Sequence, residues 1–323
     1  MKYFVAGGAG FIGSHFTDRL LSFDATRAVT LYDNFSSGRE WHYEHHLRDP
    51  RLHVIRGEVE NLPALRDAMA GHDVVIHLAS NPDIARAAVE PDIDFRQGTA
   101  LTQHVLEAMR KTGTPSLLYA SGSGVYGDLG TYEAFEDYGP LLPVSTYGAS
   151  KLAGEALISS YCAMFGLRAR AFRFGNVVGP RQTHGVGFDF VRRLREDPSR
   201  LRILGDGTQS KSYIHVEDVV DAVLLAHRAE PKPYQVFNVA TGDYITVTEI
   251  ARLAAELTGA RHCRFEYTGG SRGWKGDVPV VRLNTDRIRA LGWRCTRTSR
   301  QALKESMSAL LNEDRIHAME PCV

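Results

Sequence analysis

Short apolar runs alternate with longer amphipathic segments along the first half of the chain. The apolar runs predict buried strands at residues 2–6, 28–33, 52–56, 73–78, 116–120 and 168–174. The amphipathic segments predict helices at residues 14–21, 62–70, 99–111 and 145–165. Regular alternation of strands with helices predicts the α/β class, with a doubly wound parallel sheet.

The pattern loosens beyond Asn176, where Gly179-Pro180, Gly185 and Gly205-Asp206-Gly207 interrupt it. A segment at residues 212–226 and a strand at residues 235–239 are expected to rejoin the main lobe. We therefore expect one domain at residues 1–176 plus about 212–241, and a smaller, discontinuous C-terminal lobe at about 177–211 and 242–323.

A glycine-rich turn follows the first predicted strand and precedes the first predicted helix. Gly7 permits a tight turn, Gly10 lets the backbone approach a phosphate, and Gly13 lets the helix pack closely on the sheet. The helix N-terminus then presents free amides and a positive dipole to a pyrophosphate. This context predicts a Rossmann-type dinucleotide-binding domain.

An acidic residue, Asp33, ends the second predicted strand, about 20 residues beyond the glycines. A carboxylate at this place is suited to bind the adenosine ribose and would repel a 2′-phosphate, which favours NAD over NADP. Arg39 keeps NADP open, because a nearby arginine can accommodate that phosphate.

Tyr147 and Lys151 are four residues apart on a predicted helix and therefore share one face. A nearby ammonium and the positive nicotinamide both favour phenolate, so the pKa of Tyr147 is expected to fall. The tyrosine could then take a hydroxyl proton while the neighbouring carbon gives hydride to NAD. The alternative is an ordinary tyrosine–lysine pair on a helix surface.

Composition agrees with a cytoplasmic enzyme. The chain has 323 residues, 43% of them hydrophobic, which is enough for two lobes. Its 38 basic and 38 acidic residues balance, so charge gives no reason to expect nucleic acid or a membrane as partner. No apolar run is long enough to span a bilayer. The cysteines, Cys162, Cys263, Cys295 and Cys322, are scattered and are expected to be reduced.

Several further motifs accompany the glycines and the Tyr147–Lys151 pair. They are Asp33-Asn34, His77-Leu78-Ala79, Val125-Tyr126-Gly127, Arg173-Phe174-Gly175-Asn176, Gly205-Asp206-Gly207-Thr208-Gln209, Tyr213-Ile214-His215-Val216, and Arg272 leading to Gly276-Asp277. With them the chain resembles the extended short-chain dehydrogenase/reductase family, in particular nucleotide-sugar epimerases of the UDP-glucose 4-epimerase type. The resemblance covers nearly the whole chain.

This resemblance implies C4 epimerisation of a UDP-sugar. Tyr147 would take the proton of the C4 hydroxyl while C4 hydride passes to NAD, which leaves a bound 4-keto sugar. The ketone would turn about the diphosphate link and receive the hydride on its other face. The sugar could be of the UDP-glucose/galactose type or the UDP-glucuronate/galacturonate type.

The resemblance also implies binding residues by family position. Besides the residues above, those for the cofactor are Phe11, Ile12, Asn34, Ser37, Gly38, Glu58, Val59, Leu78, Ala79 and Ser80. Those for the substrate are Ser123, Asn176, Val186, Leu204, Gln209, Lys211, Arg272, Asp277 and Arg86. The alternatives are a surface acid for Glu58, solvated cations for Lys211 and Arg272, and a turn or cap for Asn176.

The chain departs from the family at three places. Gly122 stands where the family has a catalytic serine or threonine, and Ser121, Ser123 or a water could replace that hydroxyl. Gly98 stands where a family asparagine is expected. Lys211 replaces a phosphate-binding arginine, which keeps the charge but loses bidentate geometry.

The same strand end distinguishes between reactions. Family 4,6-dehydratases carry an acidic pair directly after the hydroxyl residue, whereas this chain has Ser123 and Gly124. Decarboxylases usually have a glutamate there, so epimerisation is favoured over both. A uronic-acid substrate would need a cation such as Arg86, Arg96 or Arg181, each of which could equally be a surface arginine. With two positions replaced by glycine, a catalytically quiet NAD-binding protein is the alternative from another class.

Two other features receive simpler interpretations. The run Trp41-His42-Tyr43-Glu44-His45-His46 contains possible metal ligands, but a solvated helix face is favoured and no metal is expected. The helices at residues 99–111 and 145–165 carry apolar stripes that suit a four-helix interface of a homodimer. The same stripes could equally be core, so the homodimer rests mainly on the resemblance.

Overall fold

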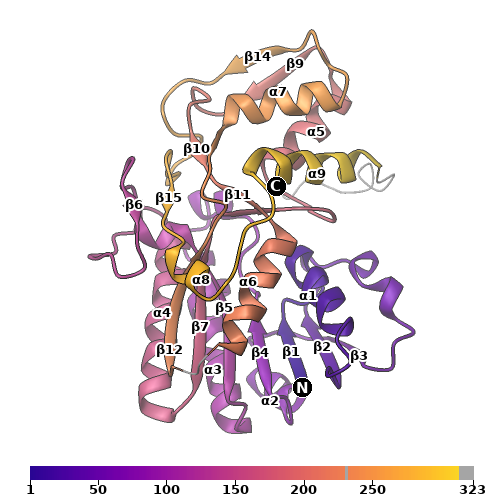
Figure 1. Ribbon diagram of the computed structural model, residues 1–323, viewed down its shortest axis with the longest axis vertical. Helices are drawn as coiled ribbons and strands as arrows, with labels where there is room; N and C mark the ends of the chain where they lie inside the picture. The colour runs from indigo at the N-terminus through magenta and orange to yellow at the C-terminus, as the bar shows by residue number, and fades with distance from the viewer. Residues whose placement is uncertain (230–231, 313–323) are drawn as a thin grey trace. The chain divides into compact units, whose positions relative to one another are not determined.

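The computed structural model describes residues 1–229 and 232–312, which form two compact units (Figure 1). The first unit comprises Met1–Val125, Thr146–Arg173 and Val220–Phe237. The second comprises Tyr126–Ser145, Phe174–Val219 and the chain from Asn238 onward. The second unit thus includes residues 126–145, which the hydrophobic pattern did not separate from the main lobe.

A seven-stranded sheet forms the centre of the first unit. Its order is β12-β7-β5-β4-β1-β2-β3, and β1 pairs in parallel with both β2 and β4. The order reverses at β1, so the gap beyond the carboxyl ends of β1 and β4 is the switch point where such sheets bind ligands. The strands are β1 Lys2–Ala6, β2 Ala28–Asp33, β3 Leu52–Arg56, β4 Val74–His77, β5 Ser116–Gly122, β7 Arg168–Phe174 and β12 Tyr234–Val239.

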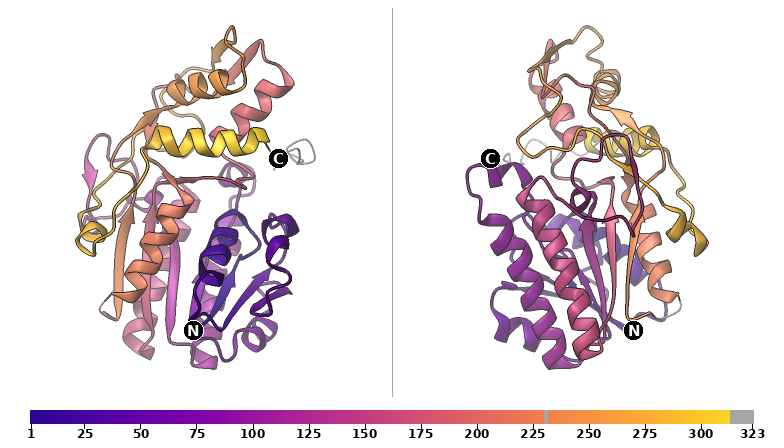
Figure 2. Two further views of the ribbon diagram at one scale, coloured as in Figure 1. Left: turned by 45° about the vertical axis from the view of Figure 1, so that its right-hand side comes forward. Right: turned by 90° about the vertical axis from the view of Figure 1, so that its left-hand side faces the viewer.

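Helices cover both faces of this sheet. On one face lie α2 (Leu62–Met69), α3 (Leu101–Thr112) and α4 (Thr146–Phe165); α3 and α4 run side by side (Figure 2). Their inner residues form one buried cluster with Phe4, Val75 and Leu117 of the sheet. The apolar stripes of α3 and α4 therefore contribute to the core of a single chain.

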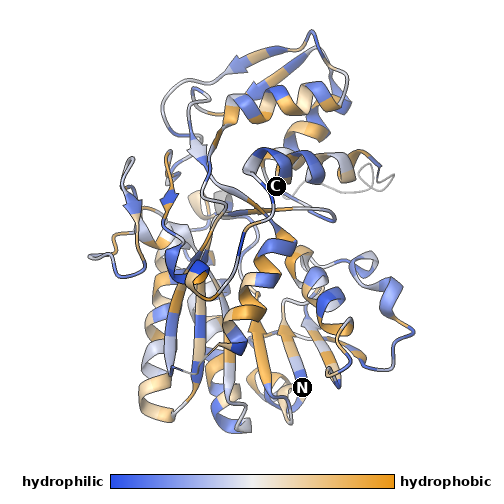
Figure 3. Cartoon of the chain, in the orientation of Figure 1, coloured by the Kyte–Doolittle hydropathy of each residue, from blue (hydrophilic) through white to orange (hydrophobic). Residues whose placement is uncertain are grey.

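The opposite face carries α1 (Phe11–Leu21) and α6 (Val216–Arg228). Arg19 of α1 and Asp221 of α6 form an ion pair of 2.9 Å. Successive side chains of a strand point to opposite faces, so β1 and β4 need apolar residues throughout when both faces are covered. Figure 3 shows both strands coloured as predominantly hydrophobic.

The second unit packs three helices, α5 (Val186–Glu196), α7 (Val247–Leu257) and α9 (Ser299–Asn312), around its own apolar cluster. A capping box starts α7, because the Thr246 and Glu249 side chains each bind the other's backbone amide. The remaining elements are short: β6 Glu133–Ala134, β8 Asn176–Val178, β9 Arg200–Ile203, β10 Ser210–Lys211, β11 Tyr213–His215, β13 Ile245–Thr246, β14 Arg264–Tyr267, β15 Arg282–Leu283 and α8 Asp286–Ala290.

The predicted strands and main helices are confirmed to within a few residues. Residues 41–46 differ from the expected helix: they form two 3₁₀ turns, η1 (Glu40–His42) and η2 (Glu44–His46). A π-helical segment, η4 (Phe95–Ala100), precedes α3 where the pattern predicted the start of the helix itself. No helix among residues 1–229 and 232–312 is long and apolar enough to cross a membrane.

Candidate active site

The glycine turn joins β1 to α1 at the switch point of the sheet. Gly7 has φ +78°, and a Cβ there would lie 2.7 Å from the Ala79 backbone nitrogen. A Cβ at Gly13 would lie 2.4 Å from the Gly8 carbonyl oxygen, so the helix needs glycine to pack against the turn. Gly10 caps α1 without a side-chain hydrogen bond, which leaves the amides of Phe11 and Ile12 available for a phosphate.

Asp33 lies at the end of β2, against this turn. Its carboxylate accepts hydrogen bonds from the backbone nitrogens of Ala9 (2.9 Å) and Phe35 (2.8 Å). Burial raises the pKa of Asp33, while these two amides act in the opposite direction. Each oxygen keeps a further acceptor site, so the geometry fits a ribose with two hydroxyl donors.

The residues expected near the adenosine gather around Asp33. The Asn34 amide donates to the Glu58 carboxylate at 3.0 Å, and Val59 beside Glu58 is buried. A Cβ at Gly38 would lie 2.9 Å from the Ala9 side chain, so residues 37–38 pass close over the glycine turn. Thus Asn34, Glu58 and Gly38 lie together at one end of the turn, as a bound adenosine would require.

The end of β4 forms the other wall of the switch point. The backbone nitrogens of Leu78 and Ala79 both donate to the Ala6 carbonyl, at 2.9 and 3.0 Å. Ser80 follows; its buried hydroxyl has no hydrogen-bond partner in the described part of the chain, but it lies close enough to Tyr147 to lower the pKa of that side chain. Residues 78–80 therefore link the glycine turn to the tyrosine.

Tyr147 and Lys151 lie on the first turns of α4. Lys151 is almost fully buried, with 3% of its surface exposed, and its Nζ donates to the Ala120 carbonyl of β5 at 2.9 Å. The same Nζ lies 5.4 Å from the centre of the Tyr147 ring and 5.3 Å from that of Tyr119. The pair is thus held against the sheet rather than on a solvated helix surface.

Burial sets the proton affinities of this pair. It raises the pKa of Tyr147 to about 12, with the Asp94 charge adding to the rise and Ser80 opposing it. Burial also lowers the pKa of Lys151 to about 8, although Asp94 acts in the opposite direction. Without a cofactor, burial and the Asp94 charge thus set the pKa of Tyr147 above its ordinary value. The expected lowering includes the charge of the nicotinamide and stays a prediction for the NAD-bound protein.

Asp94 is a site residue that the sequence did not reveal. Its carboxylate is 1% exposed and accepts hydrogen bonds from the Asn81 amide (2.9 Å) and the Thr146 hydroxyl (2.7 Å). Thr146 is the first residue of α4, so Asp94 fixes the start of the helix that carries Tyr147. A single aspartate in a polar stretch gives no periodic signal, and only the fold places it beside the pair.

At the end of β5, Gly122 leaves empty the place where the family has a serine or threonine hydroxyl. A Cβ built at Gly122 meets no atom within 4 Å, so the position of the missing hydroxyl is open space. Ser121 points to the other side of the strand, where its hydroxyl donates to Glu155 at 2.6 Å. Ser123 is half-buried at the start of the 3₁₀ turn η5 (Ser123–Tyr126), and no acidic residue occurs at 122–124.

A buried ion pair holds this strand end to α4. Glu155 of α4 and Arg173 of β7 interact through two contacts, at 2.7 and 3.0 Å, and both side chains are at most 5% exposed. With Ser121, the pair connects β5, α4 and β7 behind the Tyr147–Lys151 pair. The hydroxyl of Ser121 is thus already bonded within a structural network.

Gly98 lies in the π-helical segment η4, against α4. A Cβ there would lie 2.6 Å from the Ser150 hydroxyl and 3.0 Å from its Cβ. An asparagine at position 98 would therefore displace Ser150, which is one residue before Lys151. The close approach of η4 to α4 explains why this position is glycine.

A separate polar group forms in the second unit. Asp277, with 3% of its surface exposed, accepts from Lys211 Nζ at 2.6 Å, and its backbone carbonyl accepts from Arg272. Arg272 also pairs with Asp128 at 2.6 Å. Gln209 is 2% exposed and donates to the Leu204 carbonyl at 3.2 Å, while its Oε1 has no partner in the described part of the chain. Five expected substrate residues thus lie together.

The remaining expected substrate residues have other partners. Asn176 begins β8 and donates to the Ser212 carbonyl at 3.3 Å, and Val186 begins α5. Arg86 belongs to the first unit, where it is exposed and pairs with Glu90 at 2.7 Å. Arg86 therefore matches the surface-arginine alternative.

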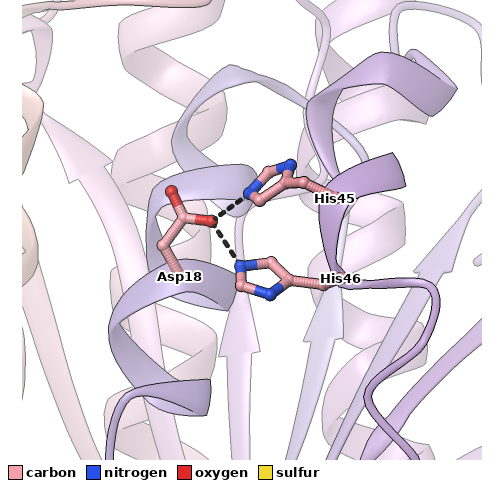
Figure 4. Close-up of side chains that lie close together, drawn as sticks. All are labelled: Asp18, His45 and His46. Atoms are coloured by element: carbon pink, nitrogen blue, oxygen red, sulfur yellow. Dashed lines mark hydrogen bonds and ion pairs between the residues drawn. The ribbon is translucent and has the colours of Figure 1, made fainter.

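The histidine-rich run contacts α1 and the glycine turn. His45 and His46 each place Nε2 within 2.9 Å of one Asp18 oxygen of α1 (Figure 4). His42 is fully buried, with Nδ1 2.6 Å from the Ala9 carbonyl. The expectation of a solvated helix face is therefore wrong for His42, which braces the turn.

The chain matches the model of the NAD dependent epimerase/dehydratase family over residues 3–240. It belongs to this family. The match covers the glycine turn, Asp33 and the Tyr147–Lys151 pair, and the family's cofactor is NAD. The geometry above fits that cofactor, because the turn, the carboxylate and the free amides of α1 occur together.

Relatives with two different activities are similar to this chain. A UDP-glucose 4-epimerase of Mycolicibacterium smegmatis is 32% identical over 302 residues, covering 91% of this chain and 93% of that protein. The crystal structure of a UDP-galactose 4-epimerase shares 36% identity and a TM-score of 0.85, over 97% of this chain and all of that one. A dTDP-glucose 4,6-dehydratase from Streptomyces venezuelae, solved with NAD, has a TM-score of 0.89 at 25% identity, over 98% of each chain. The fold therefore does not separate epimerase from dehydratase.

Proposed function

We propose that the protein is an NAD-dependent 4-epimerase of a UDP-sugar. The observation that carries this proposal is the end of β5, where residues 122–124 contain no acid although the Tyr147–Lys151 pair of α4 is present. Elimination of water needs groups that remove one proton and protonate the leaving hydroxyl. Epimerisation needs only one group that takes and returns the proton of the C4 hydroxyl.

In the first unit, different groups carry out hydride transfer, proton transfer and positioning. Bound NAD supplies the acceptor and donor for the hydride. Tyr147 takes the C4 hydroxyl proton as the 4-keto sugar forms, and returns it when the C4–H bond is made on the other face. Lys151 stays behind the tyrosine, where its ammonium favours the phenolate, and Asp94 keeps the start of α4 in place.

The second unit supplies cations for the nucleotide diphosphate. Lys211 and Arg272 would each contact a phosphate, with Asp277 orienting both side chains. The unpartnered Oε1 of Gln209 beside Leu204 supports a ligand with a hydrogen-bond donor at this place. Asn176 and Val186 remain predicted contacts on the basis of family position.

A neutral sugar is favoured over a uronic acid. Of the three arginines that could meet a C6 carboxylate, Arg86 pairs with Glu90 and Arg96 pairs with both Glu90 and Asp92, which matches the surface-arginine alternative; Arg181 stays a candidate. A C6 carboxylate would have to compete with these acids. UDP-glucose or UDP-galactose is therefore the substrate we expect first.

The missing hydroxyl at Gly122 calls for a substitute. Ser121 is bonded to Glu155, so Ser123 or a water in the open space at Gly122 would contact the sugar hydroxyl. The glycines at 98 and 122 also support the alternative, a protein that binds NAD without turnover. A homodimer through α3 and α4 remains a prediction; Met164 and Phe165 at the end of α4 are exposed.

Product analysis tests the proposal. Purified protein with added NAD is incubated separately with UDP-glucose, UDP-N-acetylglucosamine and UDP-glucuronate, and the products are identified by NMR and mass spectrometry. We expect a C4 epimer of unchanged mass, lost in the Tyr147→Phe variant. Loss of water or carbon dioxide would replace the epimerase with a dehydratase or decarboxylase. NAD binding without any product would support the alternative of a protein that binds NAD without catalysing a reaction.

A further inference from the structure

A hollow lies at the amino ends of the strands in the first unit. It has a volume of about 880 Å³ and is lined by the first residues of four strands, Lys2 of β1, Val74 of β4, Ser116 of β5 and Arg168 of β7. A second hollow of about 860 Å³ shares Ser116, Arg168 and His227 with it. The two are therefore parts of one groove, at the sheet edge opposite to the glycine turn.

Positive charge is concentrated in this groove. Its lining includes six cationic groups and the two acids Asp24 and Asp73. The whole chain has equal numbers of basic and acidic residues, so the excess is local. A concave surface of one sign focuses the field and attracts counter-ions. The cationic groups are the Met1 amino group, Lys2, Arg27, Arg168, Arg170 and Arg228.

These cations are weakly compensated by the protein. Among the described residues, Arg27, Arg168 and Arg228 make no ion pair within 4 Å, and the Met1 amino group donates to the Ala25 carbonyl at 2.7 Å. Arg170 is 5% exposed and donates to the carbonyls of Ala169 (2.9 Å) and Lys232 (2.6 Å). In this groove the cations are therefore bonded mainly to backbone carbonyls, and few acidic side chains compensate their charge.

His227 also lies in this groove, where positive charges surround it. Its Nε2 is buried and has no hydrogen-bond partner in the described part of the chain. Burial lowers the pKa of His227, and the positive charges of Arg170, Arg168 and Arg228 lower it further. A buried nitrogen without a partner costs free energy unless a ligand or a water binds it.

The groove also offers apolar surface. Tyr3 and Phe23 line it, and the Arg228 guanidinium lies 4.9 Å from the centre of the Phe23 ring. Volumes of this size accommodate ligands as large as a nucleotide. Arginine combined with an aromatic face is suited to a ligand that carries both phosphate and a flat ring.

We propose that this groove binds a phosphorylated small molecule with at least two negative charges. Arg27 and Arg168 contact the phosphates through charge-assisted hydrogen bonds, and His227 supplies a further polar contact. NAD is expected at the carboxyl ends of the strands, whereas this groove lies at their amino ends, so the two ligands would bind without competing. The proposal does not depend on the reaction proposed above.

Isothermal titration with inorganic pyrophosphate, in the presence of saturating NAD, tests the site. We expect binding that weakens at least tenfold in the Arg27→Gln/Arg168→Gln double variant, because each charged hydrogen bond contributes substantially. The exposed Arg48, which is outside the groove, provides the matched control, and Arg48→Gln should bind as the wild type does. Lys211→Met tests whether pyrophosphate binds to the second unit instead.

Two results would overturn the proposal. One is the absence of pyrophosphate binding to the NAD-saturated protein. The other is binding that the double variant retains, or that Lys211→Met alone removes. The double variant removes like charges from one surface, so its Tm should equal or exceed that of the wild type at low salt. An unchanged or higher Tm would show that the double variant is folded, so that a loss of binding comes from the loss of the two arginines.

Discussion

At the scale of single residues, Tyr147 lies between groups with opposite effects on its proton. Burial and the Asp94 charge raise its pKa, whereas the Ser80 hydroxyl lowers it. The glycines, Asp33, Tyr147 and Lys151 could be identified from the sequence because their spacing itself carries the chemistry. Asp94 could not, since only tertiary contacts place it near the tyrosine. Ser80 was expected at the cofactor from family position, but not as a neighbour of Tyr147.

Removing the Ser80 hydroxyl should make the Tyr147 phenolate harder to form. In Ser80→Ala we expect the rise of kcat/KM with pH to move to higher pH. If the profile moves by about one pH unit, the rate at pH 7 should fall roughly tenfold. The measurement is a pH–rate profile, with Ser80→Thr as the control that keeps the hydroxyl. Superimposable profiles of wild type and Ser80→Ala would contradict the role given to Ser80.

The open space at Gly122 allows a gain of activity to be tested. Gly122→Ser restores a hydroxyl where no atom obstructs it, and we expect kcat to increase about tenfold or more if a positioned proton partner is lacking. Gly122→Ala fills the same space without a hydroxyl and should give no increase. Equal rates for the two variants would show that the hydroxyl is not what the site lacks.

At the scale of elements, the Ser121–Glu155–Arg173 network ties β5, α4 and β7 together. Removing one partner of a buried ion pair leaves the other charge uncompensated. We expect Glu155→Ala to lower the free energy of unfolding by about 3–5 kcal/mol in urea denaturation. Glu196→Ala, which removes the exposed partner of the Arg192–Glu196 pair, should cost less than about 1 kcal/mol. Similar losses in both variants would refute the structural role of the network.

The elements also show where a hydrophobic pattern is sufficient. Strands buried on both faces leave a mostly apolar run, so β1, β2 and β4 were predictable. The 3₁₀ turns at residues 40–46 and the π-helical segment Phe95–Ala100 were not, because close packing on the glycine turn and on Ser150 determines them. Short-range periodicity does not encode such contacts.

At the scale of the whole molecule, buried Lys151 makes stability depend on pH. Its pKa is about 8 in the folded chain and 10.5 when exposed, so between these values the unfolded chain binds more protons. The free energy of unfolding should therefore rise with pH in this window, by about 3 kcal/mol from Lys151 alone. Cys162 and Cys295, whose pKa values burial raises, act in the opposite direction.

The difference between wild type and Lys151→Met isolates this contribution. We expect the stability of the wild type relative to Lys151→Met to increase from pH 7 to pH 10.5, as measured by urea denaturation without NAD. A constant difference would mean that Lys151 keeps an ordinary pKa. The alternation of strands and helices predicted the fold at this scale, but not that residues 126–145 belong to the second unit.

In the proposed reaction NAD takes hydride from C4 of the sugar and returns it to the same carbon, while Tyr147 takes and returns the proton of the C4 hydroxyl. The most direct measurement uses UDP-glucose or UDP-galactose deuterated at C4, with NMR and mass spectrometry of the product. We predict the C4 epimer with the deuterium still at C4 and no change in mass, and no conversion by Tyr147→Phe. Deuterium found at C6 together with loss of water would contradict the account and identify a 4,6-dehydratase.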